Sequence, residues 1–392
     1  MTEYRRVLIA ALLVLFACLG LGRFGFGIIL PNMQENLAIS TTAAGFIGTA
    51  NFIGYLVGIF LVGHLYQKFA ADKLISSALI LQAISMFLMA MSNHYLIASW
   101  FYAMAGFCSA TANVSIMVYV AHVIPQHLRG KALGIIIIGN GLGIIFSGIF
   151  VPQIEALFSE NAWRVSWGIF ALLTIIIAIL IKPGLRQHDN KVDKEKLKLS
   201  EILSHSAFWK ISSIYFIFGL TYVIYLTFFV SAAIDKYQLS IQQSGYFWLW
   251  LGFMSLLSGP FFGSLADKIG AYKTLILIFS LLSIAYLILV MQVPSVMLLV
   301  SVTLFGLAAW VIPSLVTLLT SLEYGKEKTA QVFSMVTVIF AIGQMLGPIA
   351  AGYIFDSTSS FNLVFLICTL LALAGIALSS IFHAHITKNS SE

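Results

Sequence analysis

One charged side chain lies where a lipid bilayer should exclude it. Arg23 sits in the apolar run from Val7 to Pro31, and no other Lys, Arg, Asp or Glu lies deep in a long apolar segment. An arginine near the bilayer centre costs about 3 kcal/mol or more unless water or a partner receives it. Its guanidinium is a planar fork of donors that matches a carboxylate or a phosphate. The residue type and its depth therefore predict a contact with an anionic solute.

A structural role for Arg23 is the alternative. Arg23 follows Val7 by 16 residues, about 24 Å along a helix, in the outer part of a hydrocarbon core about 30 Å thick. In a helix that runs outward, side chains lean back toward the N-terminus, so Arg23 leans toward the bilayer centre. Phe16, Gly20 and Gly27 are expected on roughly the same face. Arg23 either contacts solute there or holds its helix against neighbouring helices.

The composition indicates an integral membrane protein. Of 392 residues, 60% are hydrophobic and only 9% are charged, whereas a soluble domain carries roughly 25% charged residues. The three cysteines, Cys18, Cys108 and Cys368, lie in apolar runs and do not suggest a disulfide framework. The first apolar run is too long for a signal-peptide core of roughly 7–15 residues, so no cleavable signal peptide is expected.

Twelve segments are long and apolar enough to span a membrane, given that a span needs about 20 residues. They are 7–31, 43–65, 74–92, 96–121, 131–154, 163–182, 208–231, 243–265, 273–292, 296–320, 329–353 and 360–383. The long charged connection from Lys182 to Ser206 divides them into two sets of six. We therefore expect an N-terminal bundle (1–182), a linker (183–206) and a C-terminal bundle (207–392).

The positive charges are distributed by topology. Of the 21 Lys and Arg residues, Arg23 lies in the membrane, and Arg164 and Lys236 fall on one side of it. The other 18 fall on the side that the two termini and the linker share. By the positive-inside rule, both termini and the linker are cytoplasmic, and the protein is a multi-pass inner-membrane protein. The net charge of +6 is therefore a topology signal, and no nucleic-acid partner is expected.

Two loops 200 residues apart resemble each other. Residues 63–73 read GHLYQKFAADK and residues 263–273 read GSLADKIGAYK. In the second loop, Gly263 is expected to let two helices approach closely, and Asp267 can face the partial positive charge of a helix N-terminus. In the first loop, Gln67 replaces the acid and Ala70 the second glycine, so we expect its contact with a helix end to be weaker or differently built.

The second loop resembles the signature of the major facilitator superfamily, and with twelve spans the resemblance covers nearly the whole chain. It implies an all-α membrane protein of twelve transmembrane helices, in two pseudo-symmetric six-helix bundles around a central cavity, with rocker-switch alternating access. The gating residues it implies are Gly63, Gly263, Asp267, Lys268, Gly270, Lys273 and Arg129. Helix packing with topology alone is the other explanation of both loops.

A narrower resemblance is to the bacterial YbfB/YjiJ-like subgroup. It rests on Gly22-Arg23-Phe24 with Leu30-Pro31, Asn51 with Gly54-Tyr55, Arg129-Gly130, Trp163-Arg164-x-x-Trp167, and Gly343-Gln344-x-x-Gly347-Pro348. Small-xxx-small runs let helices approach closely in lipid, and a proline allows a kink. The packing and hinge residues expected on this basis are Gly139, Gly143, Gly343, Gly347 and Pro348.

The remaining candidate solute contacts are amides and tyrosines in the spans. They are Asn51, Asn113, Tyr119, Tyr222, Tyr225 and Gln344. A shift of 199 residues places Tyr222 at the position equivalent to Arg23, so Tyr222 and Tyr225 are expected to face it across the cavity. Each of these side chains could instead serve helix packing.

The sequence carries no signal for catalysis. It shows no catalytic cluster, P-loop or metal-binding set, so we expect a secondary transporter and no enzyme, cofactor or metal. Because no carboxylate lies in the membrane spans, transport of a small anionic organic solute, with a proton or a counter-anion as the coupled ion, fits better than cation efflux. We expect the transporter to be a monomer. Proton coupling would need a histidine, the solute itself, or acids at span ends such as Glu155 or Glu323. An exporter of neutral or amphipathic compounds is the alternative, because the many aromatic residues permit a large apolar cavity.

Overall fold

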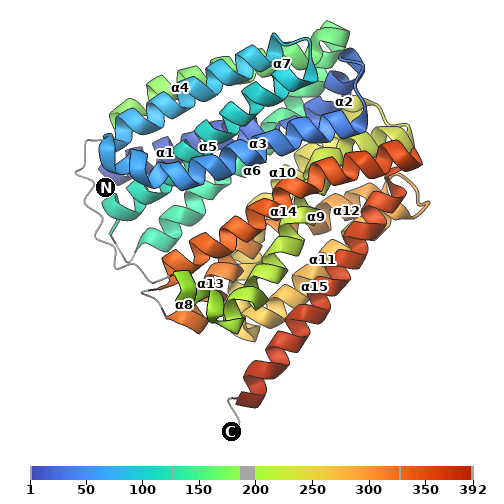
Figure 1. Ribbon diagram of the computed structural model, residues 1–392. Helices are drawn as coiled ribbons and strands as arrows, with labels where there is room; N and C mark the ends of the chain where they lie inside the picture. Colours follow the sequence, from blue (N-terminus) through green and yellow to red (C-terminus); the bar gives the residue numbers. More distant parts are fainter. Residues whose placement is uncertain (1, 126–127, 186–198, 326–327, 390–392) are drawn as a thin grey trace. The chain divides into compact units, whose positions relative to one another are not determined.

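The structure is a computed structural model, and it describes residues 2–125, 128–185, 199–325 and 328–389 (Figure 1). All regular elements in these ranges are helical. The charged run 191–198, expected to be a solvated part of the linker, lies outside the described residues.

Contacts divide the chain into two compact units. The first comprises Met1–Val192 and Thr227–Gly252, and the second comprises Asp193–Leu226 and Phe253–Glu392. This division cuts through two continuous helices, so it does not test the domain limits expected from the repeat, which stay a prediction.

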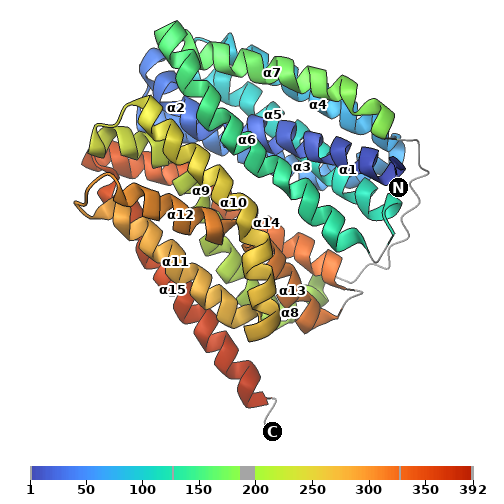
Figure 2. The ribbon, with the colours of Figure 1, turned by 180° about the vertical axis from the view of Figure 1, so that it is seen from behind.

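In the first unit, long helices follow one another through short turns. They are α1 (Thr2–Leu15), the π-helical η1 (Phe16–Phe24), α2 (Phe26–Asn36), α3 (Thr41–Lys68), α4 (Ala71–Ala90), α5 (Tyr95–Val123), α6 (Arg129–Phe158), η3 (Ser159–Asn161), α7 (Ala162–Leu180) and η4 (Lys182–Gly184). Helix α5 packs on both α3 and α4, and α4 packs on α7 (Figure 2). Helix α6 packs on α1 and η1, which places the π-helical segment inside the unit.

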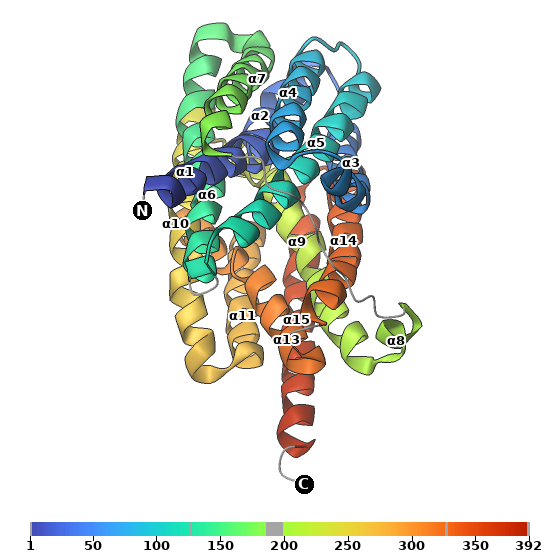
Figure 3. The ribbon, with the colours of Figure 1, turned by 90° about the vertical axis from the view of Figure 1, so that its left-hand side faces the viewer.

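The second unit is built mainly from the later helices. The remaining helices are α8 (Leu199–Ser204), α9 (Ser206–Tyr237), α10 (Ile241–Ile269), α11 (Ala271–Val290), α12 (Met297–Ala309), α13 (Ile312–Tyr324), α14 (Thr329–Thr358) and α15 (Phe361–Asn389). The end of α9 and the start of α10, from Thr227 to Gly252, belong to the first unit. Helix α11 packs on α12 and α15, and α14 packs on α13 and α15 (Figure 3).

Within the described residues, eleven segments are long and apolar enough to span a membrane. One of them, Ala132–Gly184, is 53 residues long, about 80 Å as a helix, against a core of about 30 Å. It contains α6 and α7 joined by η3, so it must cross twice. The helices thus agree with the twelve crossings expected from the sequence.

Glycines set the closest helix contacts. A Cβ atom on Gly143 of α6 would overlap Gly20 of η1, and one on Gly139 would overlap the Leu12 carbonyl oxygen. In the second unit, a Cβ on Gly343 of α14 would lie 2.6 Å from the Phe216 carbonyl oxygen of α9. These contacts have the backbone-on-backbone form that small residues permit in lipid.

The glycines at the start of the two repeated loops behave differently. Among the described residues, nothing lies within 4 Å of a Cβ built on Gly63 or Gly263. The described part of the chain thus shows no close contact at Gly263, and its expected role in helix approach stays a prediction. Gly270 instead has φ +87°, a conformation that favours glycine, whereas Ala70 at the equivalent position has φ −61°. The two loops thus turn differently, and their gating role stays a prediction.

Two residues of the Trp163-Arg164 motif tie together helix ends in the first unit. The backbone nitrogen of Trp163 donates to Asn32 Oδ1 at 2.9 Å, and its indole nitrogen donates to Asn36 Oδ1 at 2.8 Å. Arg164 Nη1 donates to the carbonyl oxygens of Ala90 and Ser92 at 2.6 and 2.7 Å. The bond from Trp163 satisfies a free donor at the start of α7, and the bond to Ala90 satisfies a free acceptor at the end of α4.

Candidate functional site

The helix that carries Arg23 is not a continuous α-helix. Residues Phe16–Phe24 form a π-helix, between α1 and α2. At its end, the Gly25 backbone nitrogen donates to the Gly20 carbonyl oxygen at 3.1 Å, a bond that spans five residues. Glycine lowers the cost of departing from α-helix, and three glycines occur between 20 and 25. Such segments are rare and frequently lie at functional sites.

The π-helix changes which side chains share a face. Phe16 packs on Phe146 of α6, with ring centroids 5.8 Å apart, and Gly20 also lies against α6. Arg23 instead faces α3. The expectation that Phe16, Gly20 and Arg23 share a face is wrong, because it assumed 3.6 residues per turn throughout, and the π-helix has a wider turn.

Arg23 lies in a cage of one amide and two aromatic rings, all from α3. Its Nε donates to Asn51 Oδ1 at 3.3 Å. Its guanidinium carbon lies 3.9 Å from the centre of the Tyr55 ring and 4.7 Å from that of Phe52. Cation–π contacts of this kind contribute roughly 0.5–2 kcal/mol each. The aromatic rings thus orient the guanidinium without neutralising its charge.

The groups around Arg23 are themselves held by α5. Asn51 donates from Nδ2 to the Tyr102 carbonyl oxygen at 3.1 Å, and Asn113 donates from Nδ2 to the Tyr55 hydroxyl at 2.8 Å. Helices α3 and α5 touch at Gly54, where a Cβ would overlap the Ala103 carbonyl oxygen. The site is therefore built on a rigid helix pair, which is what precise positioning requires.

Two polar atoms of this cluster are buried without a partner among the described residues. They are Arg23 Nη2, a charged donor, and Asn113 Oδ1, an acceptor. Leaving a buried polar atom unpaired costs roughly 1–3 kcal/mol, and more when it is charged. An acceptor such as a carboxylate oxygen would satisfy the first atom, and a hydroxyl would satisfy the second.

The other predicted contacts lie further along α5 and in the second unit. Tyr119 is buried in α5, six residues beyond Asn113 and thus about 9 Å along the helix. In the second unit, Tyr225 is buried, with its hydroxyl 2.9 Å from Ser301 Oγ and its ring stacked 3.9 Å from that of Phe305. Tyr222 stacks on the same Phe305, at 6.3 Å, and Gln344 is buried in α14. Among the predicted residues of the first unit, the structure brings together Arg23, Asn51 and Asn113.

Sequence reasoning missed several members of the cluster. Phe52 and Tyr55 follow Asn51 by one and four residues on α3, and Tyr102 supplies its carbonyl oxygen from α5. Gln82 of α4 also reaches the π-helix, where its Nε2 donates to the Cys18 carbonyl oxygen at 2.9 Å. The spacing of Asn51 and Tyr55, one helical turn apart, was the available signal.

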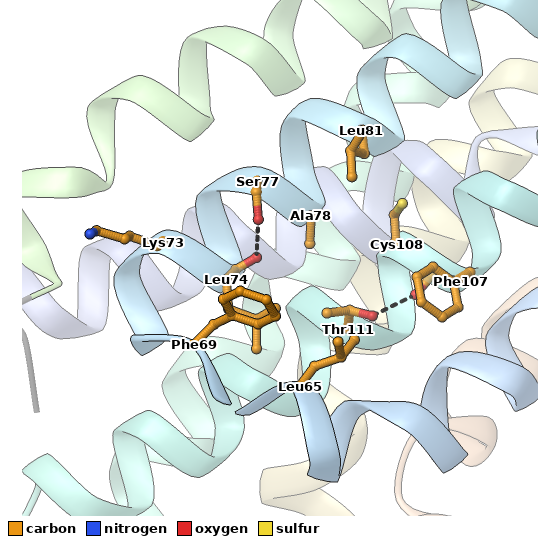
Figure 4. Close-up of a pocket in the computed structure, with 10 residues that line it drawn as sticks. All are labelled: Leu65, Phe69, Lys73, Leu74, Ser77, Ala78, Leu81, Phe107, Cys108 and Thr111. Carbon is orange, nitrogen blue, oxygen red and sulfur yellow. Dashed lines mark hydrogen bonds between the residues drawn. The ribbon is translucent and has the colours of Figure 1, made fainter. Parts of the chain in front are cut away.

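A groove between α3, α4 and α5 is unsuited to a polar solute. Its volume is about 340 Å³, and apolar side chains such as Leu65, Leu74 and Phe107 line it (Figure 4). The hydroxyls of Ser77 and Thr111 bond to carbonyl oxygens of their own helices. Lys73, at one end of the groove, is its charged lining residue.

A second hollow, of about 490 Å³, lies beside η3 and carries three carboxylates. Its lining includes Glu35, Glu155 and Glu160, with Asn32, Asn36 and Ser159. Within the described ranges, these acids do not form a group that could hold a metal ion. Their negative charge disfavours an anion, so the cluster around Arg23 is the better solute site.

Comparisons with known proteins agree with this architecture. The family model described as "Uncharacterised MFS-type transporter YbfB" matches residues 15–380. The hexuronate transporter of Bacillus subtilis (strain 168) is 23% identical, over 90% of this chain and 88% of that protein. The MFS-type transporter YceJ of the same organism is 21% identical, over 88% of each chain.

Solved structures show the same fold. The nucleoside transporter NupG has a TM-score of 0.74 at 15% identity, over 96% of this chain and 99% of that chain. A bacterial homologue of the human lysosomal transporter Spinster, in an inward-facing and unoccupied conformation, has a TM-score of 0.75 at 12% identity, over 96% of each chain. The chain is thus a multi-pass membrane transporter of small solutes and not an enzyme, and it belongs to the YbfB-type family of the major facilitator superfamily.

Proposed function

We propose that this transporter moves a small organic solute that carries a carboxylate, with Arg23 as the residue that binds the carboxylate. The observation that carries the proposal is the buried Arg23 Nη2, a charged donor without a partner among the described residues. The cage of Asn51, Phe52 and Tyr55 contributes no opposite charge. A carboxylate supplies both the missing charge and the missing acceptor.

The solute class that fits best is a sugar acid or another hydroxylated acid. The unpaired Asn113 Oδ1 would accept a hydrogen bond from a hydroxyl group, and the aromatic rings of the cage suit the apolar face of a sugar ring. The relative named as a hexuronate transporter supports this class by similarity. Tyr119, Tyr222, Tyr225 and Gln344 remain proposed contacts on the grounds of sequence.

The transport cycle is proposed to be rocker-switch alternating access, by a monomer with both termini in the cytoplasm. The charge asymmetry of the sequence supports this orientation. Uptake together with a proton, or in exchange for a counter-anion, would balance the charge of the solute. The hollow that contains Glu155 is the place in the first unit where a coupled proton could bind.

Glucuronate and glucose form a matched pair for the test, because they differ by a carboxylate on the same ring. In proteoliposomes, we expect saturable uptake of radiolabelled glucuronate that unlabelled glucuronate inhibits at concentrations about 10- to 100-fold lower than glucose does. The physical reason is that glucose leaves Arg23 without an anion. Equal inhibition by the two sugars, or uptake of amphipathic dyes that neither sugar inhibits, would favour the exporter of neutral or amphipathic compounds instead.

A further inference from the structure

We propose that Gln82 and Ser109 are positioning residues that hold the Arg23 helix in its π-helical form and thereby place Arg23 in its cage. The proposal rests on the proposed function of Arg23. It adds two side chains, from α4 and α5, that do not touch the guanidinium.

Both side chains bind one backbone oxygen within the π-helix. Gln82 Nε2 donates to the Cys18 carbonyl oxygen at 2.9 Å, and Ser109 Oγ donates to the same oxygen at 2.8 Å. A carbonyl oxygen has two lone pairs, so these two bonds occupy both. In an α-helix, that oxygen would accept from the backbone nitrogen of Gly22. The two side chains donate to that oxygen from outside the helix, so it does not depend on the α-helical bond to Gly22 or on the π-helical bond to Arg23.

Gly22 makes room for this insertion. A Cβ atom at Gly22 would overlap Gln82 Nε2, so only a glycine lets the amide reach the backbone there. Side chains inserted into the helix ladder are a recognised cause of local departure from α-helix. Arg23 follows Gly22 directly, so its direction depends on the path of this turn.

Simple helix packing does not account for these contacts. Gln82 is fully buried, and its Oε1 has no partner among the described residues, which costs stability. An apolar side chain of the same size would pack between these helices without that loss. A role for Gln82 in binding the Cys18 carbonyl oxygen, and thereby positioning Arg23, explains why a polar residue is present there.

Infrared spectroscopy can report on the bonds without any solute. The chain has three cysteines, so with Cys108→Ala and Cys368→Ala a carbonyl-labelled cysteine reports on Cys18 alone. A carbonyl that loses a hydrogen bond absorbs at higher frequency. We expect Gln82→Met and Ser109→Ala each to shift the labelled band upward, and their combination to shift it further.

Transport kinetics then test the positioning role. In the unlabelled protein, Gln82→Met should raise the KM for glucuronate about 3- to 10-fold, the equivalent of one neutral hydrogen bond, with little change in kcat. Gly22→Ala should also shift the carbonyl band upward and raise the KM, because its methyl group displaces the Gln82 amide. Ser99→Ala is the matched control on α5, since its hydroxyl bonds within its own helix, and it should change neither quantity.

Two outcomes would overturn the inference. One is an unchanged carbonyl band in the Gln82 and Ser109 variants. The other is a shifted band with unchanged KM, in a protein whose KM does respond to Arg23→Gln. Failure of the proposed function has a different signature, namely a KM for glucuronate that is insensitive to Arg23→Gln, and the carbonyl band then still tests whether the two residues hold the π-helix.

Discussion

Arg23→Gln should raise the KM for glucuronate uptake by about 10- to 100-fold. A hydrogen bond to a charged group contributes roughly 1.5–3 kcal/mol, and each 1.4 kcal/mol is a factor of ten. Glutamine keeps part of the length and one donor group but removes the charge. Initial rates in proteoliposomes over a range of glucuronate concentrations give the KM, and thermal melting in detergent shows whether the variant folds.

Arg5→Gln is the matched control for this experiment. Arg5 lies on the same helix but is exposed, so its loss should leave the KM unchanged. Arg23→Lys should give an intermediate KM, because lysine restores a charge but not the planar fork of donors. If Arg23→Gln melts like the unaltered protein and transports with the same KM, Arg23 has a structural role and the proposed function is wrong.

Gly143→Ala adds a single methyl group, but it should clearly lower the free energy of unfolding of the protein. The new Cβ would overlap Gly20 in the facing helix, so α6 and η1 would have to separate. Overpacking of this kind costs about 1–3 kcal/mol. We expect a clear decrease in the melting temperature of the purified protein.

Gly134→Ala on the same helix provides the opposite expectation. No atom of the described residues lies within 4 Å of a Cβ there, and alanine favours a helix interior by roughly 0.5–1 kcal/mol over glycine. Its melting temperature should stay level or rise. Equal decreases in the two variants would mean that helix propensity, and not the contact with Gly20, determines the effect at Gly143.

The sequence was informative where a signal is local. Hydropathy alone marks the twelve crossings, since each needs about 20 apolar residues, and a charge in an apolar run marks Arg23. The hydrogen bond between Arg23 and Asn51 was not predicted, because it depends on how the first helix packs on α3. Within the first unit, the structure brings those two residues together with Asn113.

Other features could not be predicted because they arise from departures from regular geometry. The π-helix from Phe16 to Phe24 changes the direction of Arg23 relative to Gly20, and a pattern based on 3.6 residues per turn cannot detect it. Gln82 and Tyr55 resemble many other residues in apolar helices until their partners are known. Gly263 matched a motif, but the motif does not specify whether a second helix lies against it.

The most direct test of the central claim is a thermodynamic cycle that removes the Arg23 side chain, the carboxylate of the sugar, or both, and compares the binding affinities. The affinities of glucuronate and glucose are measured by calorimetry for the purified protein and for Arg23→Gln. If Arg23 binds the carboxylate, the substitution weakens glucuronate about 10- to 100-fold and leaves glucose unchanged, a coupling that a cycle of this kind isolates. Equal losses for the two sugars, or none for either, would contradict the account.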